Sequence, residues 1–74
     1  MEERVKAIMA DIFMVDEAAI GSSASMDTIA QWDSLAQINL IAALEEEFGV
    51  AFEVEEFETM TSLSDVLETL SAKL

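Results

Sequence analysis

Cysteine, histidine and proline are all absent from this chain of 74 residues. The absence of cysteine excludes disulfides, and the absence of both cysteine and histidine excludes the usual nucleophile and base pairs and most transition-metal sites. Chains below about 80 residues usually need disulfides, a metal or very good helix packing to be stable. We therefore expect residues 1–74 to form a single domain of closely packed helices that is not an enzyme.

Basic residues are scarce, with 3 Lys and Arg against 16 Asp and Glu and a formal net charge of −13. This excess repels phosphate backbones and anionic membranes, and it favours association with basic patches on other proteins. We expect no nucleic-acid partner and expect partner enzymes with basic docking patches. The alternative is that the acidity only keeps a small, apolar-rich domain soluble.

Long hydrophobic runs are also missing. The run from Ile38 to Leu44 is interrupted by Asn39 and is followed by three glutamates, whereas a membrane span needs roughly 18 apolar residues. The first residues lack the basic and apolar segments of a signal peptide. These features predict no membrane insertion and a cytoplasmic location.

Helical periodicity dominates what the chain does contain. Apolar residues recur at spacings of three, four and seven from Glu2 to Val15, which predicts an amphipathic helix; they are Val5, Ile8, Met9, Ile12 and Phe13. Residues 16–33 contain small residues and a glycine without any period, and they predict one long loop. A loop of this length in a small domain is usually functional.

The C-terminal third of the chain predicts one short and one longer helix. Alternation after Val50 could suggest a strand, but no partner strand exists, so we expect a short helical turn over residues 55–59. The last helix should be capped by Thr61 or Ser62, and its apolar stripe is Leu63, Val66, Leu67 and Leu70. The expected fold class is all-α, a small four-helix bundle of three longer helices and one short helix, with a long loop between the first and second helices.

The second helix is predicted to begin at Ser34, with Asp33 or Ser34 as its N-cap, and to end at Gly49. One of its apolar faces should pack on the core and contains Leu40, Ile41, Leu44 and Phe48. The other should be at least partly exposed and contains Leu35, Ile38 and Ala42. Glu45 and Glu46 lie at the far end of this second face, which suits docking into an apolar groove with a basic rim. The alternative is that the first two residues of the second face pack against the long loop, under Trp32 or Ile29.

Ser34 places a hydroxyl where the loop becomes a helix. The first N–H groups of a helix have no intrahelical partner, and the helix dipole leaves about half a positive charge there, so a phosphodiester on this serine would be stabilised. The alternative is that Ser34 is only a helix cap, because Asp-Ser-Leu is a common helix start. No metal site is predicted, since residues 16–27 have the length and glycine of an EF-hand loop without its oxygen ligands.

The motif Asp33-Ser34-Leu35, with the apolar residues of the second helix and the acidic run before Phe48, resembles the acyl carrier protein family over essentially the whole chain. The resemblance implies that Ser34 carries a covalent 4′-phosphopantetheine arm, which holds acyl intermediates as thioesters for fatty acid, polyketide or other specialised biosynthesis. The implied partners are a phosphopantetheinyl transferase (holo-acyl-carrier-protein synthase) and acyl-loading, acyl-transfer or synthase enzymes. We expect a monomer, with partner binding assigned to Asp33, Leu35, Ile38, Asn39, Ala42, Glu45 and Glu46.

Four residues depart from the pattern usual in fatty-acid-synthesis carriers: Gln31, Trp32, Ala36 and Asn39. A carrier for a specialised pathway is therefore at least as well supported as one for fatty acid synthesis. The apolar core could part to shelter an acyl chain, although a stripe at helical spacing is more often only a core. The second functional hypothesis is a non-covalent acidic helical adaptor that binds partners through the second helix.

Overall fold

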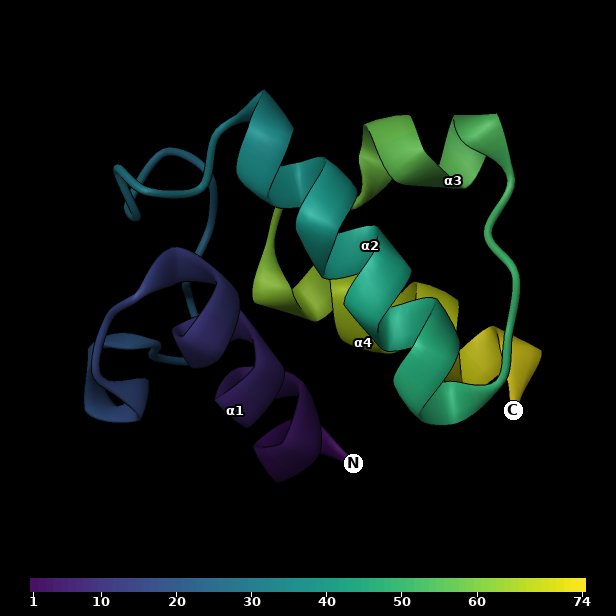
Figure 1. Ribbon diagram of the computed structural model, residues 1–74, viewed down its shortest axis with the longest axis horizontal. Coiled ribbons are helices and arrows are strands. Elements are labelled where there is room, and N and C mark those ends of the chain that lie inside the picture. Colours follow the sequence, from purple (N-terminus) through teal and green to yellow (C-terminus); the bar gives the residue numbers. More distant parts are fainter.

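The computed structural model describes residues 1–74 (Figure 1). All of its regular secondary-structure elements are helical. In order they are α1 (Glu2–Phe13), the 3-10 turn η1 (Glu17–Ala19), α2 (Ser34–Phe48), α3 (Val54–Thr59) and α4 (Leu63–Lys73). In Figure 1, α2 crosses the middle of the view, with α1 on one side of it and α3 on the other. The predicted all-α class, with three longer helices, one short helix and a long loop after the first, is confirmed.

The core is a cluster of 14 buried apolar residues. Each longer helix contributes three of them from one face: Val5, Met9 and Phe13, then Leu40, Ile41 and Leu44, then Leu63, Val66 and Leu70. The long loop also belongs to the core and contributes Ile20, Ala24, Ile29 and Trp32. Its backbone is joined to the start of α4 by hydrogen bonds from Met26 N to Thr61 O (2.9 Å) and from Leu63 N to Ala24 O (2.9 Å). The loop is therefore held against the bundle.

The end of α1 differs from the prediction. The helix ends at Phe13, two residues before the predicted Val15, because Met14 adopts a left-handed conformation with φ of 58°. The Met14 N–H donates to the carbonyl of Ala10, which closes the last turn. Met14 is 90% exposed, so no side-chain packing drives this conformation. Periodicity alone could not locate this reversal, because the reversal is set by the backbone path into the loop.

The two ends of α2 follow the prediction and settle its N-cap. Asp33 is the cap, and its Oδ1 accepts a hydrogen bond from the Ala36 N–H at 2.9 Å. At the other end Gly49 has φ of 65°, a conformation that costs glycine little, and its N–H donates to Glu45 O at 2.9 Å. The hydroxyl of Ser34 is therefore not needed to start the helix.

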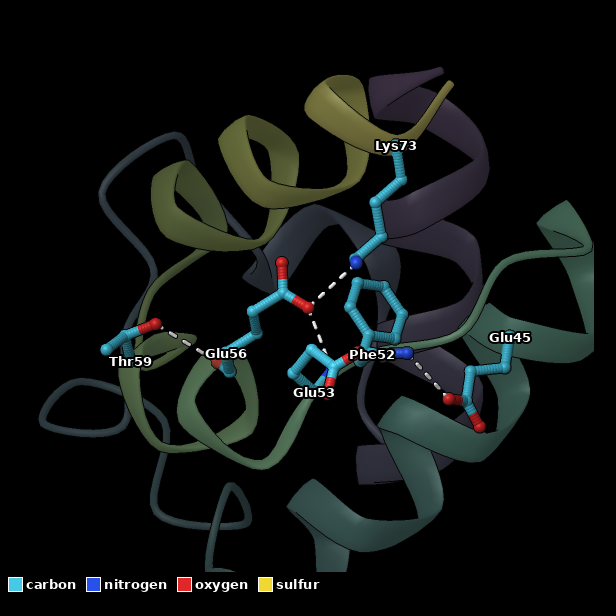
Figure 2. A network of polar contacts seen from close by, with 6 residues as sticks. All are labelled: Glu45, Phe52, Glu53, Glu56, Thr59 and Lys73. Atoms are coloured by element: carbon cyan, nitrogen blue, oxygen red, sulfur yellow. Dashed lines mark hydrogen bonds and ion pairs between the residues drawn. The ribbon is translucent and has the colours of Figure 1, made fainter.

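A small polar network holds α3 and the C-terminus of α4 together (Figure 2). The helix begins one residue before the prediction, and Glu56 accepts a hydrogen bond from the Glu53 N–H at 2.8 Å, as in a capping box. The same carboxylate pairs with Lys73 Nζ at 2.7 Å. Beside it, Lys73 Nζ lies 5.5 Å from the centre of the Phe52 ring, and the Phe52 N–H donates to Glu45 Oε2 at 2.9 Å. The network joins α2, α3 and α4.

This network lowers the pKa of one of its carboxyl groups. The hydrogen bond from the Glu53 N–H, followed by the hydrogen bond and charge of Lys73, holds the pKa of Glu56 below its ordinary value of 4.5. Both contacts favour the ionised carboxylate. The attachment of α3 to α4 is consequently tied to the charge of Glu56.

Candidate functional site

The junction before α2 is fixed by a buried tryptophan. Trp32 is 2% exposed, its ring centroid lies 5.1 Å from that of Phe13, and its backbone N–H donates to Ile29 O at 3.0 Å. Asp33 and Ser34 follow directly and are both exposed. The chain is therefore anchored one residue before the cap and two before the serine, which places the Ser34 hydroxyl at a defined point on the surface.

A hollow with a volume of about 190 Å³ opens beside this serine. It is lined by residues from the loop, α2, α3 and the turn before α4, namely Met26, Ser34, Gln37, Phe57, Glu58 and Thr61. Only two of the six are hydrophobic. We call it the Ser34 hollow.

Gln37 is a residue of this site that the sequence analysis missed. It is 3% exposed, and its amide makes three hydrogen bonds: Oε1 accepts from Trp32 Nε1 at 2.6 Å, and Nε2 donates to Met60 O at 2.8 Å and to Phe57 O at 3.1 Å. A signal was present in the sequence, because Gln37 precedes Ile41 and Leu44 on the core face at helical spacing. A polar residue at such a position needs buried partners.

The second apolar face of α2 is exposed, as predicted. Leu35 is 68% and Ile38 is 54% exposed, and Ala42 is also exposed. The alternative, that the loop covers Leu35 and Ile38, is wrong because Trp32 and Ile29 are buried in the core instead. These three residues follow one another at spacings of three and four along one side of the helix. We call them the apolar strip.

The polar residues predicted beside this strip differ in exposure and in the hydrogen bonds that they already make within the chain. Asn39 and Glu46 are exposed. Glu45 is partly buried, and its carboxylate accepts the Phe52 N–H. Asp33 is exposed but holds the helix cap. Their roles in partner binding stay predictions.

All three basic side chains of the chain pair with its own carboxylates. Arg4 pairs with Glu47 and lies over the Phe48 ring at 4.8 Å, Lys6 pairs with Glu2 at 3.2 Å, and Lys73 pairs with Glu56. Of the other Asp and Glu residues, none has an ion-pair partner within the chain. The surface around α2 therefore presents uncompensated negative charge.

Two structural observations bear on other functions. No group of three or more acidic side chains is placed to hold a metal ion, and the residues of the EF-hand-like segment, 16–27, form no such group. None of the helices has both the length and the apolar composition that crossing a membrane requires.

An exposed serine hydroxyl at the start of a helix is a chemically suitable point for a phosphate-linked group, because the helix N-terminus stabilises negative charge. Comparison with known proteins shows the family of the chain. Residues 3–70 match the family model described as a phosphopantetheine attachment site. The chain is 43% identical over 72 residues to an acyl carrier protein of Thermosynechococcus vestitus, and the matched region covers 97% of this chain and 89% of that protein. It is 39% identical over 72 residues to an acyl carrier protein of Petrotoga mobilis, covering 97% and 85% of the two chains.

The chain therefore belongs to the acyl carrier protein family, and its cofactor is a covalently attached 4′-phosphopantetheine. Members of this family are carriers and not catalysts, and they interact with a phosphopantetheinyl transferase and with synthase or acyl-transfer enzymes. The structure offers a fitting attachment point, because the Ser34 side chain is exposed and spared from capping.

Proposed function

We propose that Ser34 is the residue that carries 4′-phosphopantetheine, through a phosphodiester on Oγ. The observation that supports this most directly is the division of roles at the start of α2: Asp33 caps the helix, and Ser34 stays exposed. The N–H groups of Ser34 and Leu35 have no acceptor within the helix and lie next to the proposed phosphate. Together with the helix dipole, they would stabilise its negative charge.

The attachment reaction asks little of this chain. A bond forms between Ser34 Oγ and the phosphorus next to pantetheine in coenzyme A, the pyrophosphate bond breaks, and adenosine 3′,5′-bisphosphate leaves. The hydroxyl proton passes to a general base on the transferase. When bound, the arm supplies a terminal thiol that forms thioesters with acyl groups. The part of this chain is to hold the attachment point in solvent beside a docking surface.

The apolar strip is the surface we assign to partner enzymes. It begins at Leu35, next to Ser34, and ends near Glu46, so one partner surface could contact the strip while its active site reaches the serine. Asp33, Asn39 and Glu45 border it. An apolar groove with a basic rim is complementary to this arrangement. Glu46 should contribute more than Glu45, because the carboxylate of Glu45 already holds the Phe52 N–H.

A specialised acyl pathway, such as polyketide or modified-lipid synthesis, is at least as well supported for this carrier as fatty acid synthesis. The support is the set of residues that differ from the usual fatty-acid carrier pattern, now placed around the site: Gln31 and Trp32 before it, Ala36 and Asn39 on α2. We expect the carrier to act as a monomer, with residues 1–74 as one domain in the cytoplasm. These points stay predictions.

The attachment site can be tested by loading the apo protein with coenzyme A and a broad-specificity phosphopantetheinyl transferase, followed by intact-mass spectrometry. We expect one added arm on the wild type and none on Ser34→Ala. Ser64→Ala is the matched control, since Ser64 is another exposed serine in the first turn of a helix. Loading of Ser34→Ala would contradict the assignment. A wild type that stays unmodified while binding its partner would favour the non-covalent adaptor.

A further inference from the structure

Gln37 forms the inner wall of the Ser34 hollow. It is the one buried polar side chain of the chain, and it lines the hollow together with Ser34. Its hydrogen-bond partners on the inner side are residues of the core, since Trp32 is 2% and Met60 is 0% exposed. A group that passed from the hollow into the core on this side would have to displace the glutamine.

The hydrogen bonds of Gln37 leave its amide no free hydrogen. The indole N–H of Trp32 can only donate, so it must face Oε1, and the two carbonyl oxygens must face the NH₂ group. Phe57 O belongs to the last turn of α3, where carbonyl oxygens receive no hydrogen bond from their own helix. The Gln37 amide supplies the missing hydrogen bond to this oxygen. Displacement of Gln37 would leave the indole N–H and two carbonyls unpaired next to the core.

The rest of the hollow is mixed in character. Most of its lining surface is apolar, with Met26 and Phe57 as its hydrophobic residues, while Glu58 and Thr61 add a carboxylate and a hydroxyl at positions exposed to solvent. A short acyl group could pack on the apolar part, and a hydroxyl on such a group could donate a hydrogen bond to the Glu58 carboxylate. The hollow is open to solvent, so full burial of a long saturated chain would require passage into the core past Gln37.

We propose that Gln37 is a specificity-determining residue, which closes the Ser34 hollow against the core, so that this carrier holds short or polar acyl groups at its surface and keeps long saturated chains out of its interior. The inference rests on the attachment of the arm to Ser34 proposed above. The inference limits the cargo to short or polar acyl groups. It also means that the core of the wild-type protein does not shelter a long acyl chain.

The wild type tests this directly. The apo protein is loaded by the transferase from acetyl coenzyme A in one sample and from octanoyl coenzyme A in another, and loading is checked by intact mass. We expect the methyl NMR signals of the core residues Leu40, Leu44 and Leu70 to be the same in the two forms. The fluorescence of Trp32, the single tryptophan, should also be the same. Core signals that move only with the octanoyl group would overturn the inference.

Gln37→Ala should remove the wall. In this variant we expect the octanoyl form, but not the acetyl form, to shift the core methyl signals and to raise the midpoint of thermal unfolding. Gln31→Ala is the control, because Gln31 is exposed and lies near the same loop end. If Gln37→Ala folds but its core methyl signals and unfolding midpoint are the same in the acetyl and octanoyl forms, the inference is overturned. If the variant does not fold, the comparison of the two wild-type forms decides the question. A chain that accepts no arm would instead refute the attachment to Ser34, and this inference with it.

Discussion

Asp33 and Ser34 are neighbours with different bonding, and the proposed function depends on this difference. The carboxylate of Asp33 accepts the Ala36 N–H, whereas the Ser34 hydroxyl makes no hydrogen bond within the chain. Sequence alone could not assign the cap, because both residue types are preferred there. The structure resolves the choice in favour of Asp33, and a serine released from capping is available for modification.

This division predicts unequal effects on stability. Asp33→Ala should lower the free energy of unfolding by about 1 kcal/mol, because the Ala36 N–H loses its acceptor. Ser34→Ala should leave it unchanged within about 0.5 kcal/mol, as is usual for an exposed position without such a bond. Urea denaturation of the unmodified variants measures both. A loss for Ser34→Ala as large as that for Asp33→Ala would show that the serine is structural.

Prediction from the sequence succeeded at the residues whose position follows from helical spacing and missed Gln37. The exposure of Leu35 and Ile38 follows from their angular separation from the core face of the same helix. Helical spacing places Gln37 on the core face, but the two carbonyls that accept hydrogen bonds from its amide there lie 20 and 23 positions further along the chain, and no local pattern identifies them. Likewise the left-handed Met14 follows from the path of the backbone and not from its side chain.

At the scale of elements, the apolar strip of α2 makes a prediction about partners. Leu35→Asp should slow loading by the transferase about tenfold, which corresponds to the loss of roughly 1.4 kcal/mol of contact energy. It should leave stability nearly unchanged because Leu35 is already 68% exposed. Steady-state kinetics of arm transfer measures the effect. Val54→Asp is the matched control, since Val54 is an equally exposed apolar residue on α3. Equal slowing by both variants would mean that charge, and not the strip, is responsible.

The attachment of α3 to α4 makes a prediction about acid. Glu56 has a lowered pKa in the folded state, so its contribution to stability is present above its ordinary pKa of 4.5 and is lost as the pH falls through the lowered value. The wild type should therefore be more stable than Glu56→Gln at pH 7, and the difference should vanish in acid. Thermal unfolding from pH 7 to pH 3 measures this. Glu55→Gln, an exposed glutamate of the same turn, controls for the removal of one negative charge. A difference between the wild type and Glu56→Gln that persists in acid would contradict the account.

The order and type of the helices were predictable because each longer helix has a clear apolar face and because polar N-caps, Asp33 and Ser62, begin α2 and α4. The predicted boundaries of α2 agree with the structure because a capping residue and Gly49 mark its ends. The loop was predicted as a connection, but its place in the core was not. Ile20, Ile29 and Trp32 are isolated apolar residues in a segment without period, so their burial depends on contacts with the helices.

At the scale of the whole molecule, the net charge of −13 should oppose folding and promote docking. Added salt screens both interactions. Raising sodium chloride from 10 mM to 150 mM should therefore increase the unfolding midpoint, with roughly 4–8 °C expected for each kcal/mol of relief in a domain of this size. The same change should slow loading by the transferase. Differential scanning calorimetry and loading rates measure the two effects.

Potassium chloride is the control and should raise the unfolding midpoint by the same amount as sodium chloride. A midpoint that rises with only one of the two salts would indicate specific binding of that cation, and it would contradict screening as the cause.

The central claim is that one of the seven serines, Ser34, bears the arm. Fragmentation mass spectrometry of the loaded wild-type chain tests it most directly, because the fragments locate the added mass along the sequence. The account predicts that the whole of the added phosphopantetheine lies on fragments that contain Ser34. Added mass on fragments that lack this residue, or a chain that takes no arm from any transferase, would contradict it.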